Sequence, residues 1–145
     1  MDFNRLRREH RVLLDGAAEL GTVSRSVQGR TDADRAAQTI AGLDELIVAH
    51  LRHEDRDLYG QLSEGADAAL RAEAGDAYAN MGGLGGAWAQ FAAYWTPEVI
   101  AARPAAFDKA AASLLSALLM RIRYEEETLY PAAEKVMIAD GGAEH

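Results

Sequence analysis

The chain has 145 residues, no cysteine and a formal net charge of −8, from 23 acidic and 15 basic residues. This acidic balance argues against a non-specific nucleic-acid binder, because phosphate contacts require a positively charged surface. The lack of cysteine excludes disulfide bonds, thiolate metal sites and thiol nucleophiles, and it is typical of a protein in a reducing compartment.

The N-terminal residues MDFNRLRREHR are charged, and no segment has the roughly 18 uninterrupted apolar residues that a membrane span needs. We therefore predict a cytoplasmic protein that binds neither a membrane nor a nucleic acid. Whether the chain binds a protein partner stays open, and Tyr94 with an edge of Trp95 is the candidate contact patch.

Abundant alanine, only three prolines and few β-branched runs predict an all-helical protein. The length is sufficient for one domain with its own core, which we place at residues 1–138, followed by a flexible tail at residues 139–145. Apolar residues at alternating spacings of three and four predict four helices. The predicted helices are Phe3–Val27, Thr31–Glu64 with Thr31 as its cap, Asp67–Trp95, and Ala105–Ile138 after a longer connection through Pro104.

Four amphipathic helices joined by short turns favour an up-down-up-down four-helix bundle. Folding the chain back near residues 30, 65 and 101 brings His10, His50, Met81 and Arg121 to one level along the bundle. Glu54 and Glu125 lie one turn away on their own helices, about 6 Å along the axis. The inward polar residues of three helices therefore converge on one cavity.

The segment HLRHEDRDLYG at residues 50–60 returns as RIRYEEETLYP at residues 121–131. In each copy an acid lies four residues after the first position, so the two side chains share one face of a helix. His50 and Glu54 have the spacing and the chemistry of metal ligands. Arg121, four residues before Glu125, carries a guanidinium that cannot coordinate a metal. The repeat therefore predicts a metal site that has lost part of its ligand set.

These two segments, together with LRREHRVLL at residues 6–14, resemble the helix motifs of the hemerythrin-like, or HHE cation-binding, family over nearly the whole chain. The resemblance implies a four-helix bundle around a non-heme di-iron centre, with histidines from all four helices and two bridging carboxylates. Members of that family bind O₂ or nitric oxide, sense oxygen or iron, or repair iron–sulfur clusters.

By this resemblance, His10 and His50 are the terminal ligands of one iron, and Glu54 and Glu125 are the bridging carboxylates. The second iron would need imidazoles from the third helix and from the first position of the fourth-helix motif. This chain has MGGLGG around Met81 at the former place and Arg121 at the latter. The resemblance therefore implies protein ligands for one iron, together with the two bridging carboxylates, but not the imidazoles for the second iron.

Two interpretations stay open for the residues that remain. In the first, His10, His50, Glu54 and Glu125 form a mononuclear site for one iron, manganese or zinc ion. In the second, no metal is bound, and Arg121 takes its place by neutralising Glu54 and Glu125 through bidentate hydrogen bonds.

We accordingly predict a binding or sensory module with at most a mononuclear cation site. One alternative is a metal-free helical protein with an interaction or regulatory role. The other is a non-heme iron protein that binds O₂ or nitric oxide or repairs iron–sulfur clusters. No nucleophile–base pair is recognisable, so we assign no catalytic residues and do not favour an enzyme.

Three further residues are candidates for hydrogen bonds to the ligands. His53 is either a spare ligand or a boundary histidine hydrogen-bonded to a neighbouring acid. Tyr59 and Tyr130 occupy matching places in the two motifs, and they are either donors to the site or packing residues near helix ends.

The segment MGGLGG at residues 81–86 places four glycines inside a predicted helix. Each glycine costs a helix about 1 kcal/mol relative to alanine, so another feature should offset them. A close helix–helix approach, a kink or a small opening to the cavity would each do so.

Overall fold

The computed structural model describes residues 2–136, apart from the side chains at positions 55 and 80–82. Every regular element in this range is helical, which confirms the predicted all-α class. The predicted tail at residues 139–145, the predicted helix end at Ile138 and the side chain of Met81 lie outside the described residues. No helix in the described part of the chain is long and apolar enough to cross a membrane.

The α-helices are α1 (Phe3–Arg25), α2 (Arg30–His53), α3 (Gly60–Ser63), α4 (Ala68–Tyr94), α5 (Pro97–Ala102) and α6 (Pro104–Tyr124). Two π-helical segments, η1 (Glu54–Tyr59) and η2 (Glu125–Leu129), continue α2 and α6 without a break. Residues 130–136 after η2 are again helical. The second and fourth predicted helices are therefore continuous rods, but each contains a π-helical insertion that regular periodicity does not predict.

The start of α2 differs from the predicted Thr31 cap. Gly29 precedes the helix with a φ of +104°, a conformation that glycine adopts without strain, and no side chain caps the helix from that position. The carboxylate of Asp32 instead accepts a hydrogen bond of 2.8 Å from the backbone N–H of Gln28. The Thr31 prediction is wrong because a glycine two residues earlier can reverse the chain, and an acid in the first turn supplies the acceptor.

The connection after α4 also differs from the sequence prediction, because it contains the short helix α5. Thr96 caps this helix, with its hydroxyl accepting from the backbone N–H of Val99 at 3.4 Å, and Pro97 occupies the first turn, where its missing N–H costs nothing. Ile100 is fully buried and helps to hold α5 against the core, while α5 itself packs on α2. The connection therefore closes one end of the molecule.

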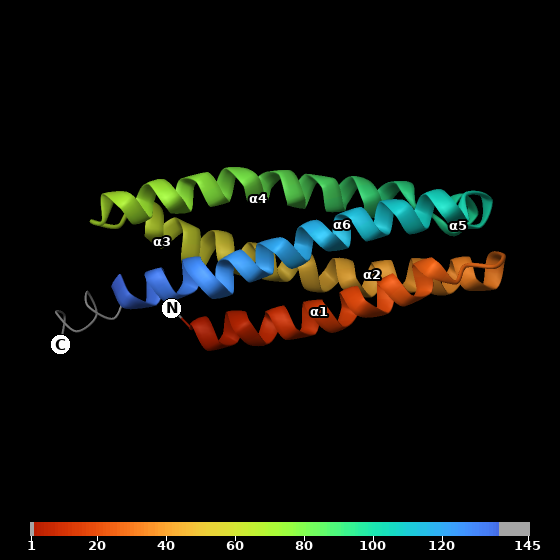
Figure 1. Cartoon of the computed structure of the whole chain (residues 1–145), viewed down its shortest axis with the longest axis horizontal. Coiled ribbons are helices and arrows are strands. Elements are labelled where there is room, and N and C mark those ends of the chain that lie inside the picture. The colour runs from red at the N-terminus through yellow and green to blue at the C-terminus, as the bar shows by residue number, and fades with distance from the viewer. Residues whose placement is uncertain (1, 137–145) are drawn as a thin grey trace.

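The long helices lie side by side along the molecule, with α5 at one end and α3 toward the other (Figure 1). The helix α1 packs on α2 and α6, and α4 packs on the same two helices. Two clusters of buried apolar side chains result. The cluster on the α5 side includes Leu13, Leu43, Trp88, Ile100 and Phe107, and the cluster on the α3 side includes Leu6, Leu58, Leu62, Leu70 and Leu129.

Candidate metal centre

Four ionisable side chains meet between the two apolar clusters. His10 comes from α1, His50 from the end of α2, and Glu54 and Glu125 from the first positions of η1 and η2. All four are 0–4% exposed, and one donor atom from each lies within 4.8 Å of the others. Ligand atoms on opposite sides of one transition-metal ion are about 4 Å apart, so the group has the size of a site for a single ion.

The donor atoms of this cluster are close together but only partly hydrogen-bonded. His10 Nε2 lies 3.0 Å from Glu125 Oε1 and 3.4 Å from Glu54 Oε1, and His50 Nε2 lies 2.8 Å from Glu54 Oε1. Nevertheless His50 Nε2 and Glu54 Oε2 are buried without a hydrogen-bond partner among the described residues. Buried polar atoms are normally paired, so these unpaired imidazole and carboxylate atoms fit a site that takes a cation.

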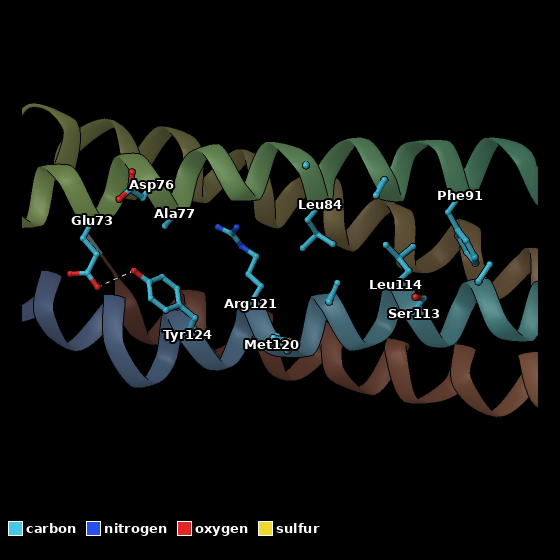
Figure 2. Close-up of a pocket in the computed structure, with 14 residues that line it drawn as sticks. Glu73, Asp76, Ala77, Leu84, Phe91, Ser113, Leu114, Met120, Arg121 and Tyr124 are labelled. Carbon is cyan, nitrogen blue, oxygen red and sulfur yellow. Dashed lines mark hydrogen bonds between the residues drawn. The ribbon is translucent and has the colours of Figure 1, made fainter.

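Arg121 lies on the far side of the two carboxylates from the imidazoles. Its Nη2 donates to Glu125 Oε2 at 3.0 Å and to the Tyr59 hydroxyl at 2.6 Å, and it lies 3.8 Å from Glu54 Oε2. The side chain is 12% exposed and extends from α6 toward α4 (Figure 2). A guanidinium cannot bind a metal ion, so the residues around Arg121 do not fit a second cation.

The two tyrosines of the repeated motif each reach the carboxylate of the other motif. Tyr59 donates its hydroxyl proton to Glu125 Oε2 at 3.0 Å, and Tyr130 donates a short hydrogen bond to Glu54 Oε1. Both tyrosines are buried, and the Tyr130 ring stacks on His10 with 5.3 Å between the ring centroids. Of the two interpretations of these tyrosines, the contacts therefore match donation to the site, although both rings also pack in the α3-side cluster.

The π-helical segments explain why these tyrosines face the site. The backbone N–H of Tyr130 bonds the carbonyl of Glu125, five residues earlier, instead of the four of an α-helix. The extra residue lets Leu58 and Tyr59, and likewise Leu129 and Tyr130, be buried as adjacent pairs. π-Helical turns are frequent at functional sites. The repeated Leu-Tyr pair was the available sequence signal, because two adjacent residues rarely share one inward face of an α-helix.

A family model described as the hemerythrin HHE cation-binding domain matches residues 1–133 of this chain. The chain belongs to the hemerythrin HHE cation-binding family. This confirms the resemblance that the helix motifs indicate, and the matched range contains all four candidate ligands, Arg121 and both tyrosines. No curated protein and no solved structure matches the chain.

Sequence reasoning missed Glu9 as a residue of this HHE domain's centre. Its Oε1 lies 2.8 Å from His50 Nδ1, and its Oε2 lies 3.0 Å from His53 Nδ1. With its Nδ1 proton donated to Glu9, His50 directs the free lone pair of Nε2 into the cluster. His53 is 23% exposed and bonded to Glu9, as expected for the boundary histidine rather than for a ligand. No spacing within one helix could reveal the contact of Glu9, because it joins α1 to α2.

The protonation of the HHE centre follows from its burial and its two carboxylates. Burial alone would lower the pKa of His10, but hydrogen bonds and charges from Glu125 and Glu54 outweigh it and raise this pKa to about 9. Burial also opposes the ionisation of Glu54, yet contacts with His10 and His50 hold its pKa well below the usual range. Burial and the neighbouring charge of Glu54 raise the pKa of Glu125 to about 7. Protons therefore occupy the centre at neutral pH, where a cation would compete with them.

Proposed function

We propose that this HHE domain is a binding or sensory module that takes one divalent cation. Iron, manganese or zinc would be held by His10, His50, Glu54 and Glu125, a set of imidazole and carboxylate donors that suits each of them. The observation that carries this proposal is the buried cluster of donor atoms within 4.8 Å, in which His50 Nε2 and Glu54 Oε2 lack a hydrogen-bond partner among the described residues. A bound cation would supply the positive charge that the two buried carboxylates need.

We further propose that the scaffold is the up-down-up-down four-helix bundle of hemerythrins, formed by the rods that begin with α1, α2, α4 and α6. In this assignment α5 belongs to the connection between the third and fourth rods. The packing of α1 and of α4 on both α2 and α6 supports it.

In this proposal the centre is a di-iron site of the family that has lost one of its two ion positions. Arg121 stands where a second cation would otherwise be, and its fixed positive charge replaces that ion. Its hydrogen bonds to Glu125 and Tyr59 support this role, because they use the Glu125 oxygen that the imidazole of His10 leaves free. A guanidinium cannot dissociate into solution, so only one of the two charges remains exchangeable. A module with one exchangeable cation is suited to sensing or storing that cation.

The number of ions per chain tests the proposal. Protein purified without chelators and without nickel affinity resin should contain about one iron, manganese or zinc ion per chain by elemental analysis. His50→Ala should abolish binding and leave the far-UV circular dichroism nearly unchanged, because the variant removes a ligand that is not part of either apolar cluster. Two ions per chain, or absorbance from an oxo-bridged iron pair, would contradict the proposal.

Glu9 should contribute to cation affinity although it is not a proposed ligand. Glu9→Gln removes the charge that orients His50, and such changes typically weaken metal binding by about 10- to 100-fold. Free Mn(II) measured by electron paramagnetic resonance during a titration gives the affinity. Glu19→Gln, an exposed position on the same helix, is the control and should bind as the parent does. Unchanged affinity in Glu9→Gln would show that His50 is oriented without Glu9.

A metal-free interaction module is the second candidate function. The specific observation in its favour is that the centre can balance its charges with groups of this chain. Arg121 bonds Glu125, and a protonated His10 lies between Glu125 and Glu54. Protein that remains metal-free after incubation with excess iron, manganese and zinc would favour this candidate.

A further inference from the structure

An open groove of about 840 Å³ runs between α4 and α6 (Figure 2). Small-molecule sites typically have volumes of about 300–1,000 Å³. The groove exists because the two helices face each other with small residues, which cannot fill the space between them. These residues are Ala77, Gly83 and Ala87 from α4 and Ala110, Ser113 and Ala117 from α6.

Close helix packing does not explain the glycines of this segment that the structure describes, Gly83, Gly85 and Gly86. A Cβ atom built on Gly83 or Gly86 would meet no atom within 4 Å, and one on Gly85 would lie 3.6 Å from Leu51 Cδ1, an ordinary contact. Gly83 lines the groove, whereas Gly86 does not. Alanine would therefore fit at either position and would favour the helix by about 1 kcal/mol. An open groove is a reason to keep position 83 free of a side chain.

The two ends of the groove differ in chemistry. Leu84, Leu114 and Phe91 line one end, and Met120 stands at the edge with 69% of its surface exposed. At the other end are two acids, Glu73 and Asp76, with Tyr124 and Arg121 (Figure 2). The groove is thus amphipathic along its length.

The polar end carries an excess of negative charge. Glu73 accepts a hydrogen bond of 3.0 Å from the Tyr124 hydroxyl, but neither Glu73 nor Asp76 forms an ion pair with another described residue. Among the described residues that line this end, the one cation is Arg121, and it is already paired with Glu125. Two carboxylates therefore face the groove without a counter-charge, on a chain whose overall charge is −8.

We propose that this groove binds a small amphipathic organic cation. Its protonated amine lies against Glu73 and Asp76, and its apolar body lies along Leu84 and Leu114 and covers Met120. An anionic ligand is disfavoured, because its charged end would approach the same two carboxylates. The site lies on the opposite side of Arg121 from the imidazoles, and it does not require a cation in the metal centre.

Octylammonium is the probe, with octanoate and octanol as matched ligands of the same chain length. Isothermal titration calorimetry should give a dissociation constant for octylammonium at least about tenfold lower than for octanol, which corresponds to about 1.4 kcal/mol. Octanoate should bind more weakly than octanol. Equal or tighter binding of octanoate would overturn the proposed cation chemistry.

Two leucine variants locate the binding site. Gly83→Leu should fill the groove and weaken octylammonium binding at least about tenfold, and Gly86→Leu, on the same helix but outside the groove, should bind as the parent does. Both variants should fold, because each replaces a helical glycine next to open space. The double variant Glu73→Gln, Asp76→Asn should lose the preference for octylammonium over octanol.

Parent-like binding by Gly83→Leu would overturn the proposal, since the ligand would then lie elsewhere. Analytical ultracentrifugation of the same variants tests the competing occupant, a second copy of the chain. Self-association of the parent that Gly83→Leu abolishes, without measurable octylammonium binding by the parent, would also overturn the proposal.

Discussion

Arg121→Ala should lower the free energy of unfolding of the metal-free domain by about 3 kcal/mol or more, the usual cost of removing one partner from a buried ion pair. The substitution leaves Glu125 without its guanidinium partner in a site that is 1% exposed, and it removes the hydrogen bond to Tyr59. The imidazoles of His10 and His50 are then left to oppose the negative charge of the two buried carboxylates. Urea unfolding followed by far-UV circular dichroism in the presence of a chelator measures the loss.

Arg123→Ala is the matched control for this substitution. Arg123 is exposed on the same helix, and surface substitutions of this kind usually change stability by less than about 0.5 kcal/mol. Adding Mn(II) should stabilise Arg121→Ala more than it stabilises the parent, because the ion supplies charge that the variant lacks. A loss in Arg121→Ala no larger than in Arg123→Ala would show that the guanidinium is not a stabilising counter-charge.

The metal-free domain should lose stability as the pH rises from about 4.5 to about 9. The folded-state pKa of His10 is about 9 and its ordinary value is 6.5, so its contribution is complete below pH 6.5 and disappears as the pH passes 9. That difference corresponds to about 3 kcal/mol. Glu125 acts in the same direction, because its pKa is raised from 4.5 to about 7 and its contribution is lost as the pH passes 7. The pKa of Glu54 is lowered, so its contribution to the free energy of unfolding is present at neutral pH and is lost only as the pH falls into the acid range.

A bound cation should reverse this trend. Coordination requires His10 and His50 without a proton on the ligating nitrogen, so affinity rises with pH and the stabilisation by Mn(II) grows over the same interval. Thermal unfolding at several pH values, with chelator or with excess Mn(II), should give two curves that diverge toward alkaline pH. Parallel curves would show that the ion does not displace the protons of this centre.

The fold class and the inward faces of the helices were predictable because apolar residues repeat regularly along the chain. The seam positions Leu13, Leu43 and Phe107 are all buried. The wrong predictions concern segments whose sequence is compatible with more than one local structure. Nothing in the pattern around Thr31 shows that Gly29 will take a positive φ, and the short stretch that forms α5 has too few residues for its periodicity to be recognised.

The centre was predictable to the extent that its residues sit at helical spacings within one motif. His50 with Glu54, and Arg121 with Glu125, follow from a separation of four residues. The seam of α1 points His10 toward them. Contacts between helices could not be derived in the same way, because they depend on how the helices are rotated against each other. The hydrogen bond between His50 and Glu9 is one example. The bonds from Tyr59 to Glu125 and from Tyr130 to Glu54 are two others.

The geometry of the centre depends on the two π-helical segments, because each accommodates one residue more than an α-helical turn would. Each residue of an α-helix turns the chain by about 100°. If η1 or η2 wound as an ordinary α-helix with the same number of residues, all later residues of the rod would rotate by about this angle. Tyr59 would then turn away from Glu125, or Tyr130 away from Glu54. Exposed positions within these segments can therefore exchange one amino acid for another, but a change that tightens the wide turn without removing a residue would take the tyrosines out of reach of the carboxylates.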